Sequence, residues 1–184
     1  GIIEDYFARV NTALQSGRPA VRVGVIHPVE SYWLYFGPEE QTSVARERLE
    51  RQFEQVTEWL LFGLVDFDYL SESLMLALGS EADEDGFRTG EMKYDAVIVP
   101  GCVTLRENTL NKLTAFAKKG GKVILMGDAP ALVDAVSDDR PKALADISCR
   151  IGFDYGQLME ALQAYRTVDV LDVRGVRSSC YLYQ

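Results

Sequence analysis

One segment, residues 94–130, restricts the possible folds of this chain more than any other. Two apolar runs of strand length, residues 96–99 and 123–126, flank a stretch with helical periodicity. The first run ends in a Pro-Gly pair and the second in a Gly-Asp pair, both of which are turn signals. Apolar runs joined by a crossover helix are typical of buried parallel strands with a right-handed connection. The segment therefore predicts a strand–helix–strand unit.

The helix expected inside this unit has signals at both ends. Thr104 and Glu107 have the Ser/Thr-x-x-Glu spacing of a capping box, which predicts that the helix begins there. At the other end, two lysines at 118–119 place cations in the last turn, and two glycines at 120–121 tolerate positive φ. The helix is therefore expected to end at these glycines.

Hydrophobic periodicity and turn residues divide the rest of the chain. Before the central unit we expect a helix over residues 3–14, a strand over 21–28, an aromatic loop over 31–36, a long helix over 38–63, a strand over 65–70 and an amphipathic turn over 74–78. After it we expect two short helical pieces around Pro141 within residues 131–150, a helix over 155–165, and strands over 168–173 and 180–183 joined by a turn. The apolar stripe of the first helix predicts that it packs on something.

Alternating strands and helices predict an α/β fold, a flavodoxin-like three-layer sandwich with a mainly parallel central sheet and the first strand central. Ligands of such sheets usually bind beyond the carboxyl ends of the strands. The candidate ligand-binding residues are those expected at these ends: His27, Glu30, Ser31, Trp33, Glu72, Gly101, Cys102 and Asp128.

The single histidine limits nucleophilic chemistry. A Ser–His or Cys–His pair would have to combine His27 with Ser31, Ser71 or Cys102. The alternative for His27 is that its ring hydrogen-bonds backbone and so fixes the loop after the first strand. The alternative for Cys102 is that of a small, half-buried apolar residue, although a thiolate near a helix start is also compatible with its position.

Carboxylates and aromatic residues offer two further kinds of site. Glu30, Glu72 and Asp128 include possible acid/base pairs for glycoside hydrolysis, or they cap the helices that follow. The aromatic run at 32–36, which contains Trp33, is suited to stacking on a sugar, to a protein interface or to core packing.

Composition argues against several partners. The formal net charge of −9 disfavours nucleic acid and anionic membranes, and no apolar run is long enough to cross a bilayer. The three cysteines give neither a disulfide framework nor a zinc site, which weakly favours a reducing, cytoplasmic location. The acidic stretch at 81–85 lacks the spacing of an EF-hand, and no GxGxxG or Walker pattern is present. No metal or cofactor is therefore expected.

The segment YDAVIVPG, its helix and GGKVILMGDAP resemble the class I glutamine amidotransferase-like fold. In catalytic relatives of that fold a cysteine occupies the nucleophile elbow. The matching position here is Gly127, and no histidine follows it. The resemblance therefore implies a non-catalytic member.

The segment EDYFARVNTALQSGRPAVRVGVIHPVESYW resembles the junction after the catalytic (β/α)₈ barrel of large bacterial glycoside hydrolases, including β-galactosidases with a trimerisation domain. The resemblance implies that residues 1–18 form a helix and linker after an upstream barrel and that residues 19–175 form the amidotransferase-like domain. Residues 176–184 would be a last strand or the entry to a β-rich domain.

Three functions follow as hypotheses. The first is a non-catalytic accessory domain that contacts the catalytic barrel and β-rich domains of the same chain or a second copy, and edges a carbohydrate site. The second is a stand-alone module that binds a small sugar, and the third is a Cys–His or Ser–His hydrolase.

Overall fold

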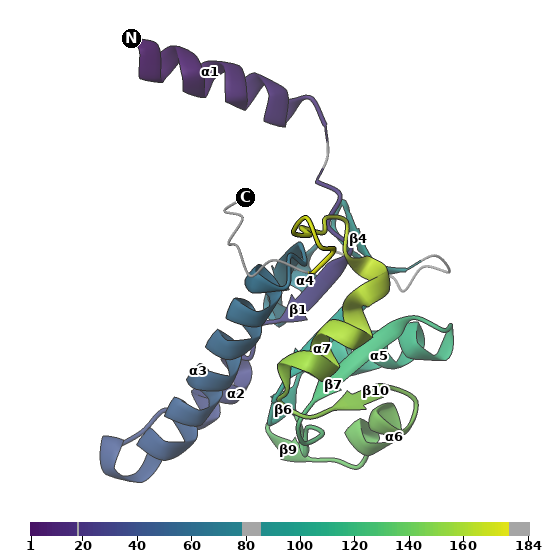
Figure 1. Cartoon of the computed structure of the whole chain (residues 1–184). Coiled ribbons are helices and arrows are strands. Elements are labelled where there is room, and N and C mark those ends of the chain that lie inside the picture. Colours follow the sequence, from purple (N-terminus) through teal and green to yellow (C-terminus); the bar gives the residue numbers. More distant parts are fainter. Residues whose placement is uncertain (18, 79–85, 177–184) are drawn as a thin grey trace.

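The computed structural model describes residues 1–17, 19–78 and 86–176, and it confirms an α/β fold around a parallel sheet (Figure 1). The sheet contains β1 (Val23–Ile26), β2 (Phe67–Leu70), β5 (Ala96–Pro100), β7 (Lys122–Met126) and β10 (Cys149–Ile151). Their spatial order is β2-β1-β5-β7-β10, and every neighbouring pair is parallel. Numbered along the chain, this is the order 2-1-3-4-5 of flavodoxin-like sheets. β1 is an interior strand, although the middle strand is β5.

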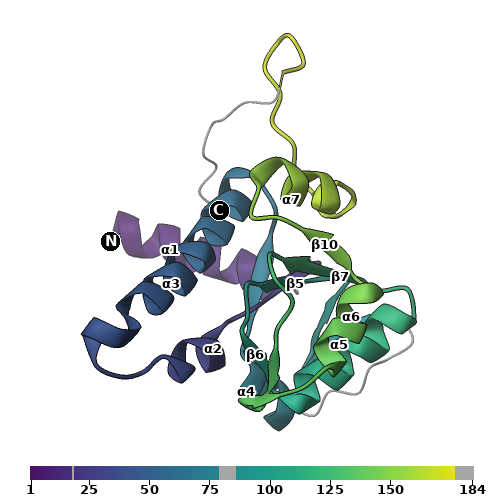
Figure 2. The same cartoon turned by 90° about the horizontal axis from the view of Figure 1, so that it is seen from below.

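Helices cover both faces of the sheet, which gives three layers (Figures 1 and 2). α3 (Glu39–Phe62) and α7 (Tyr155–Leu162) share one core cluster with the sheet. α4 (Glu72–Ala77), α5 (Glu107–Lys118) and α6 (Arg140–Asp146) share the other. Alternate strand residues point to opposite faces, so β1, β2, β5 and β7 contribute to both clusters, whereas the edge strand β10 contributes only to the cluster under α3 and α7.

Within β5 this alternation is visible residue by residue. Val97 and Val99 belong to the cluster under α5, whereas Ala96 and Ile98 belong to the cluster under α3. All five residues of β5 are buried. The apolar runs at 96–99 and 123–126 thus form adjacent parallel strands joined by a helix, as their pattern predicts.

Shorter elements complete the described chain. They are α1 (Ile2–Gln15), α2 (Val29–Leu34), β3 (Phe87–Thr89), β4 (Met92–Tyr94), β6 (Thr104–Leu105), β8 (Leu132–Val133), β9 (Val136–Ser137) and the 3₁₀ helix η1 (Gln163–Tyr165). β3 and β4 form an antiparallel hairpin, and β6, β8 and β9 form a small second sheet.

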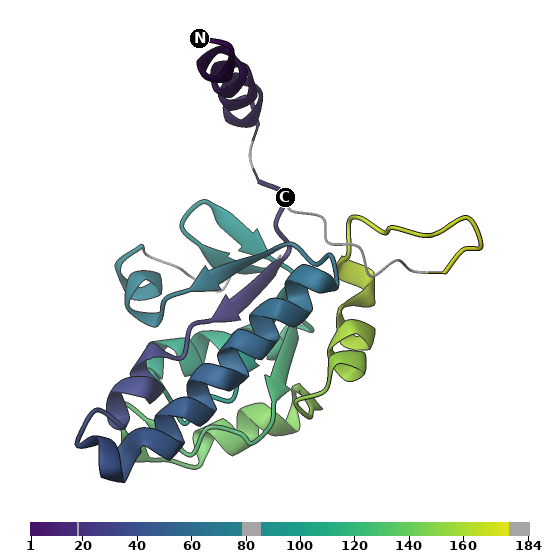
Figure 3. The same cartoon turned by 60° about the vertical axis from the view of Figure 1, so that its left-hand side comes forward.

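α1 stands apart from the α/β body (Figures 1 and 3). None of its residues is buried, so nothing in the described part of the chain covers the apolar stripe. The expected packing partner of this helix is therefore not found among the described residues.

The predicted capping box at the start of the central helix is wrong. α5 begins at Glu107 with Arg106 at its N-cap, and Thr104 lies in β6. The Thr104 hydroxyl accepts a hydrogen bond from the amide of Ala135 at 3.1 Å. Strand pairing with β8 keeps residue 104 extended, and this tertiary contact overrides the local capping signal.

The predicted aromatic loop at 31–36 is also wrong, because α2 occupies most of it. Pro28 takes the N-cap position and its carbonyl accepts from the amide of Tyr32 at 3.0 Å. Glu30 lies in the first turn, where the helix dipole favours a carboxylate.

Two regions after β7 differ from expectation. The first of the two helical pieces expected in residues 131–150 is the β8–β9 hairpin, and the second is α6, in which Pro141 lies in the first turn. The edge strand β10 ends this region and was not expected. It is short and half-buried, so it lacks the apolar run that marks the inner strands.

Residues 168–173 form no strand. The amide of Asp172 donates to the Val176 carbonyl at 2.7 Å, and the amide of Gly175 donates to the Asp172 carbonyl at 2.9 Å. A turn thus lies where Arg174-Gly175 predicts one. The strand expected at 180–183 and the acidic turn at 81–85 fall outside the described residues.

Candidate functional site

Ser31 anchors the loops at the carboxyl end of the sheet. Its side chain is fully buried in α2, and its hydroxyl accepts from the amides of Val103 and Thr104 at 2.9 and 3.1 Å. The same hydroxyl lies 3.2 Å from the Thr104 carbonyl, to which it donates. The Ser31 oxygen is therefore committed to fixing the segment after β5, and it is not available as a nucleophile.

Glu30 lies next to this anchor and pairs with Arg106. The Glu30 Oε1 accepts from the Arg106 Nε at 2.8 Å, and the Glu30 side chain is only 13 % exposed. Its buried Oε2 has no hydrogen-bond partner among the described residues. The pair joins the segment after β1 to the segment after β5.

Glu72 fixes the backbone immediately before α5. It is 2 % exposed in the first turn of α4, and its Oε2 accepts from the Arg106 amide at 2.7 Å, immediately before α5 begins. Burial raises the pKa of this carboxyl to about 7, and the negative charge of Glu30 adds to this effect. The Arg106 amide, the Thr109 hydroxyl and the Arg106 charge oppose it.

Cys102 lies beside these acids and is 3 % exposed. Burial raises the pKa of its thiol well above the usual range, and the charges of Glu72 and Glu30 raise it further. A reactive cysteine needs the opposite surroundings, an electropositive site that favours the thiolate. Cys102 therefore fits the role of a small core residue.

His27 lies at the end of β1 but faces a different set of groups. Its ring packs against Phe53 and Tyr69, with centroid distances of 4.9 and 6.0 Å. Its amide donates to the Leu70 carbonyl at 3.0 Å, which extends the pairing of β1 with β2. The expected hydrogen bond from the ring to backbone is not found among the described residues, where the ring makes aromatic contacts instead.

The two glycines at strand ends adopt the left-handed region. Gly101 has a φ of 58° and Gly127 a φ of 77°. A Cβ on Gly127 would lie 2.8 Å from the ring of Phe153, so a larger side chain there requires Phe153 to move. Asp128, the next residue, is exposed at the end of β7.

A pocket of about 280 Å³ opens beside the Glu30–Arg106 pair. Its lining includes both side chains of the pair, Trp33, and the turn at Asp134. Trp33 is 61 % exposed, so much of its side chain is accessible to a ligand. Asp134 and Ala135 both have positive φ, 46° and 65°, as expected for the two central residues of the tight turn between β8 and β9.

The structure brings together four of the predicted site residues at the ends of β1, β2 and β5: Glu30, Ser31, Glu72 and Cys102. Trp33 joins them at the edge of the pocket, whereas the His27 ring packs against Phe53 and Tyr69. Arg106 was not predicted, although an arginine directly before a helix and after a buried strand is a usable signal.

No group of three or more histidine, cysteine or acidic residues in the described segments is arranged to hold a metal ion. Within the same segments, no helix is both long and apolar enough to cross a membrane. Comparisons with protein-family models, with curated proteins and with solved structures found no match. Any proposal of function therefore rests on the residues themselves.

Proposed function

We propose that this chain is a non-catalytic accessory domain of a multidomain carbohydrate-active enzyme, with a class I glutamine amidotransferase-like fold. Its role is to dock against the catalytic barrel of the same polypeptide. The observation that carries the proposal is the uncovered apolar stripe of α1. The carbohydrate context comes from the resemblance of residues 4–33 to the junction after such a barrel.

The apolar side chains of the α1 stripe are unusually exposed to solvent. Ile3, Phe7 and Leu14 lie on one face and are 72 %, 63 % and 75 % exposed. An amphipathic helix gains most of its stability from burying this face, because an isolated helix of 14 residues is marginal in water. A stable α1 therefore needs a surface to cover the stripe.

The groups at the strand ends support a non-catalytic role. The Ser31 hydroxyl is occupied by backbone groups, and the high pKa of Cys102 disfavours its thiolate. Phe153 fills the space that a nucleophile at position 127 would need. These contacts disfavour the Ser–His or Cys–His hydrolase.

The test compares two double variants in the full polypeptide. Ile3→Glu/Phe7→Glu places two charges on the stripe, whereas Ala8→Glu/Thr12→Glu places the same charges on the opposite face of α1. We expect only the first to separate the barrel from the accessory domain in limited proteolysis and to lower glycosidase turnover. Equal behaviour of the two variants would contradict docking through the stripe.

A second function, sugar binding, is favoured by Trp33 beside the Glu30–Arg106 pair. An exposed indole face stacks on the apolar face of a sugar ring, while a carboxylate and a guanidinium hydrogen-bond its hydroxyls. Calorimetry against mono- and disaccharides tests this function, with Trp33→Ala as the variant. Phe36→Ala is the control, because Phe36 is 82 % exposed near the same helix but does not line the pocket. Flat calorimetric traces with every sugar would exclude sugar binding.

A further inference from the structure

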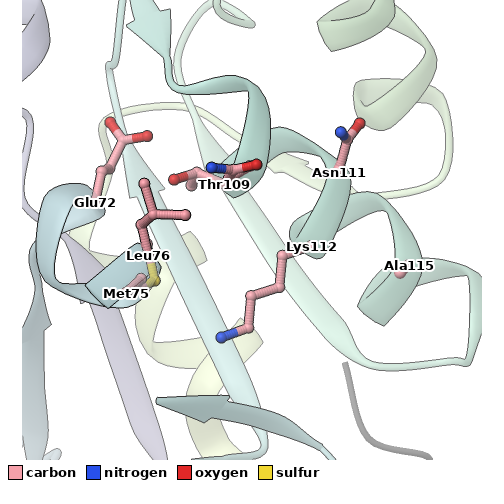
Figure 4. A pocket seen from close by; sticks show the side chains of 8 residues that line it. Glu72, Met75, Leu76, Thr109, Asn111, Lys112 and Ala115 are labelled. Carbon is pink, nitrogen blue, oxygen red and sulfur yellow. The ribbon is translucent and has the colours of Figure 1, made fainter. Parts of the chain in front are cut away.

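A second pocket, of about 340 Å³, lies between α4 and α5 (Figure 4). Four buried residues line its inner part: Glu72 and Met75 from α4, and Thr109 and Lys112 from α5. Two exposed asparagines of α5 line its outer part. A helix face turned toward a neighbouring helix is normally apolar, so this polar lining is unusual.

Glu72 and Lys112 are the two ionisable groups of this pocket. Figure 4 shows Glu72 on α4 and Lys112 on α5, with Leu76 between them. Glu72 is 2 % exposed and Lys112 is 8 % exposed. Long charged side chains are almost never this buried unless they are paired.

Neither group has an ion pair within the described residues. The Glu72 Oε2 accepts from the Arg106 amide, and the Thr109 hydroxyl is a second neutral donor to the carboxylate, whereas its Oε1 has no hydrogen-bond partner there. The Lys112 amine donates to the Arg88 carbonyl and lies 4.3 Å from the centre of the Phe87 ring. Within the described residues, each charge is therefore desolvated without a direct ion pair.

The ionisation of both groups reflects this environment. Burial raises the pKa of Glu72 to about 7 and lowers the pKa of Lys112 to about 8. Around Glu72, the other charged groups are Glu30 on α2, which raises its pKa, and Arg106, which lowers it. Arg106 thus offsets the burial of Glu72 only in part, and burial alone shifts the pKa of Lys112.

We propose that this pocket binds a small zwitterion, with the ligand ammonium near Glu72 and the ligand carboxylate near Lys112. The two ionic contacts would satisfy the free Oε1 of Glu72 and supply the missing partner of Lys112. Met75 and Leu76 provide an apolar wall for the carbon chain between the two ligand charges. The pocket volume lies near the lower end of the range for ligand sites, which suits a compact amino acid. The proposal is independent of the accessory role.

The experiment titrates the ¹⁵N-labelled chain with glycine, β-alanine, γ-aminobutyrate and δ-aminovalerate while amide shifts are followed by NMR. We expect one length to bind best, because the distance between the ligand charges must match the two side chains. Butylamine and butyrate carry one charge each, and each should bind about tenfold more weakly or worse, since a charge-assisted hydrogen bond contributes about 1.5–3 kcal/mol.

Variants assign the two contacts. Glu72→Gln and Lys112→Met keep the shape of each side chain, and each should weaken the best ligand about tenfold or more. Glu54→Gln and Lys118→Met remove the same charges from exposed positions on α3 and α5, and should leave binding unchanged. Thermal melts confirm that the variants fold. The proposal is overturned if no member of the series shifts the pocket amides, if single-charge analogues bind equally well, or if both pocket variants retain full binding.

Discussion

Replacing Glu72 by glutamine should make the protein more stable at high pH and leave it unchanged at low pH. The pKa of this carboxyl is about 7 in the folded chain and 4.5 as its ordinary value, so the folded state binds the proton more tightly. At 1.36 kcal/mol per pKa unit, this difference corresponds to about 3 kcal/mol. Between pH 4.5 and about 7 the unfolded state holds fewer protons, so stability falls as the pH rises.

Glutamine mimics the protonated acid and keeps an oxygen to accept from the Arg106 amide. Urea unfolding should therefore give Glu72→Gln and the wild type the same free energy near pH 4.5, where Glu72 is protonated when folded. At about pH 8.5 the variant should be more stable by about 2–3 kcal/mol. Glu54→Gln, on the exposed side of α3, should show no such pH-dependent difference. A variant that is less stable than the wild type at high pH would refute the reasoning.

Three further substitutions test the packing, each by urea unfolding. Ser31→Ala leaves the Val103 and Thr104 amides without their acceptor and should lose about 2 kcal/mol, whereas a loss below the measurement error would contradict the anchoring role. Gly127→Ala combines a positive φ with a Cβ contact to Phe153 and should lose about 2 kcal/mol, and a neutral result would show that Phe153 moves freely. Leu110→Ala removes a side chain that is 1 % exposed and should lose about 3 kcal/mol, unless the cavity under α5 collapses.

The inner layers of the fold could be predicted because their signals are periodic. Buried apolar runs such as residues 96–99 predict strands, and an apolar face at helical spacing predicts the long helix at 38–63. The errors lie where tertiary contacts decide the local conformation. Thr104 has a capping pattern, but pairing with β8 holds it in a strand, and the edge strand β10 has no apolar run to reveal it.

The location of the candidate site could be predicted from the sequence, but the contacts that its residues make could not. Glu30, Ser31, Glu72 and Cys102 meet because parallel strands end on one edge of the sheet. Their contacts could not be read from the sequence, since they depend on distances between segments far apart in the chain. For the same reason no pattern separated Lys112, buried on the α4 side of α5, from the exposed lysine at 118.

The hydrogen bonds that join Ser31 and Glu72 to the segment after β5 limit the length that this segment can have. Three backbone amides there, those of Val103, Thr104 and Arg106, are held by side chains from two other connections. One extra residue between β5 and α5 would move these amides away from both the Ser31 hydroxyl and the Glu72 carboxylate. Surface connections usually tolerate insertions, but we expect an insertion in this one to destabilise the domain.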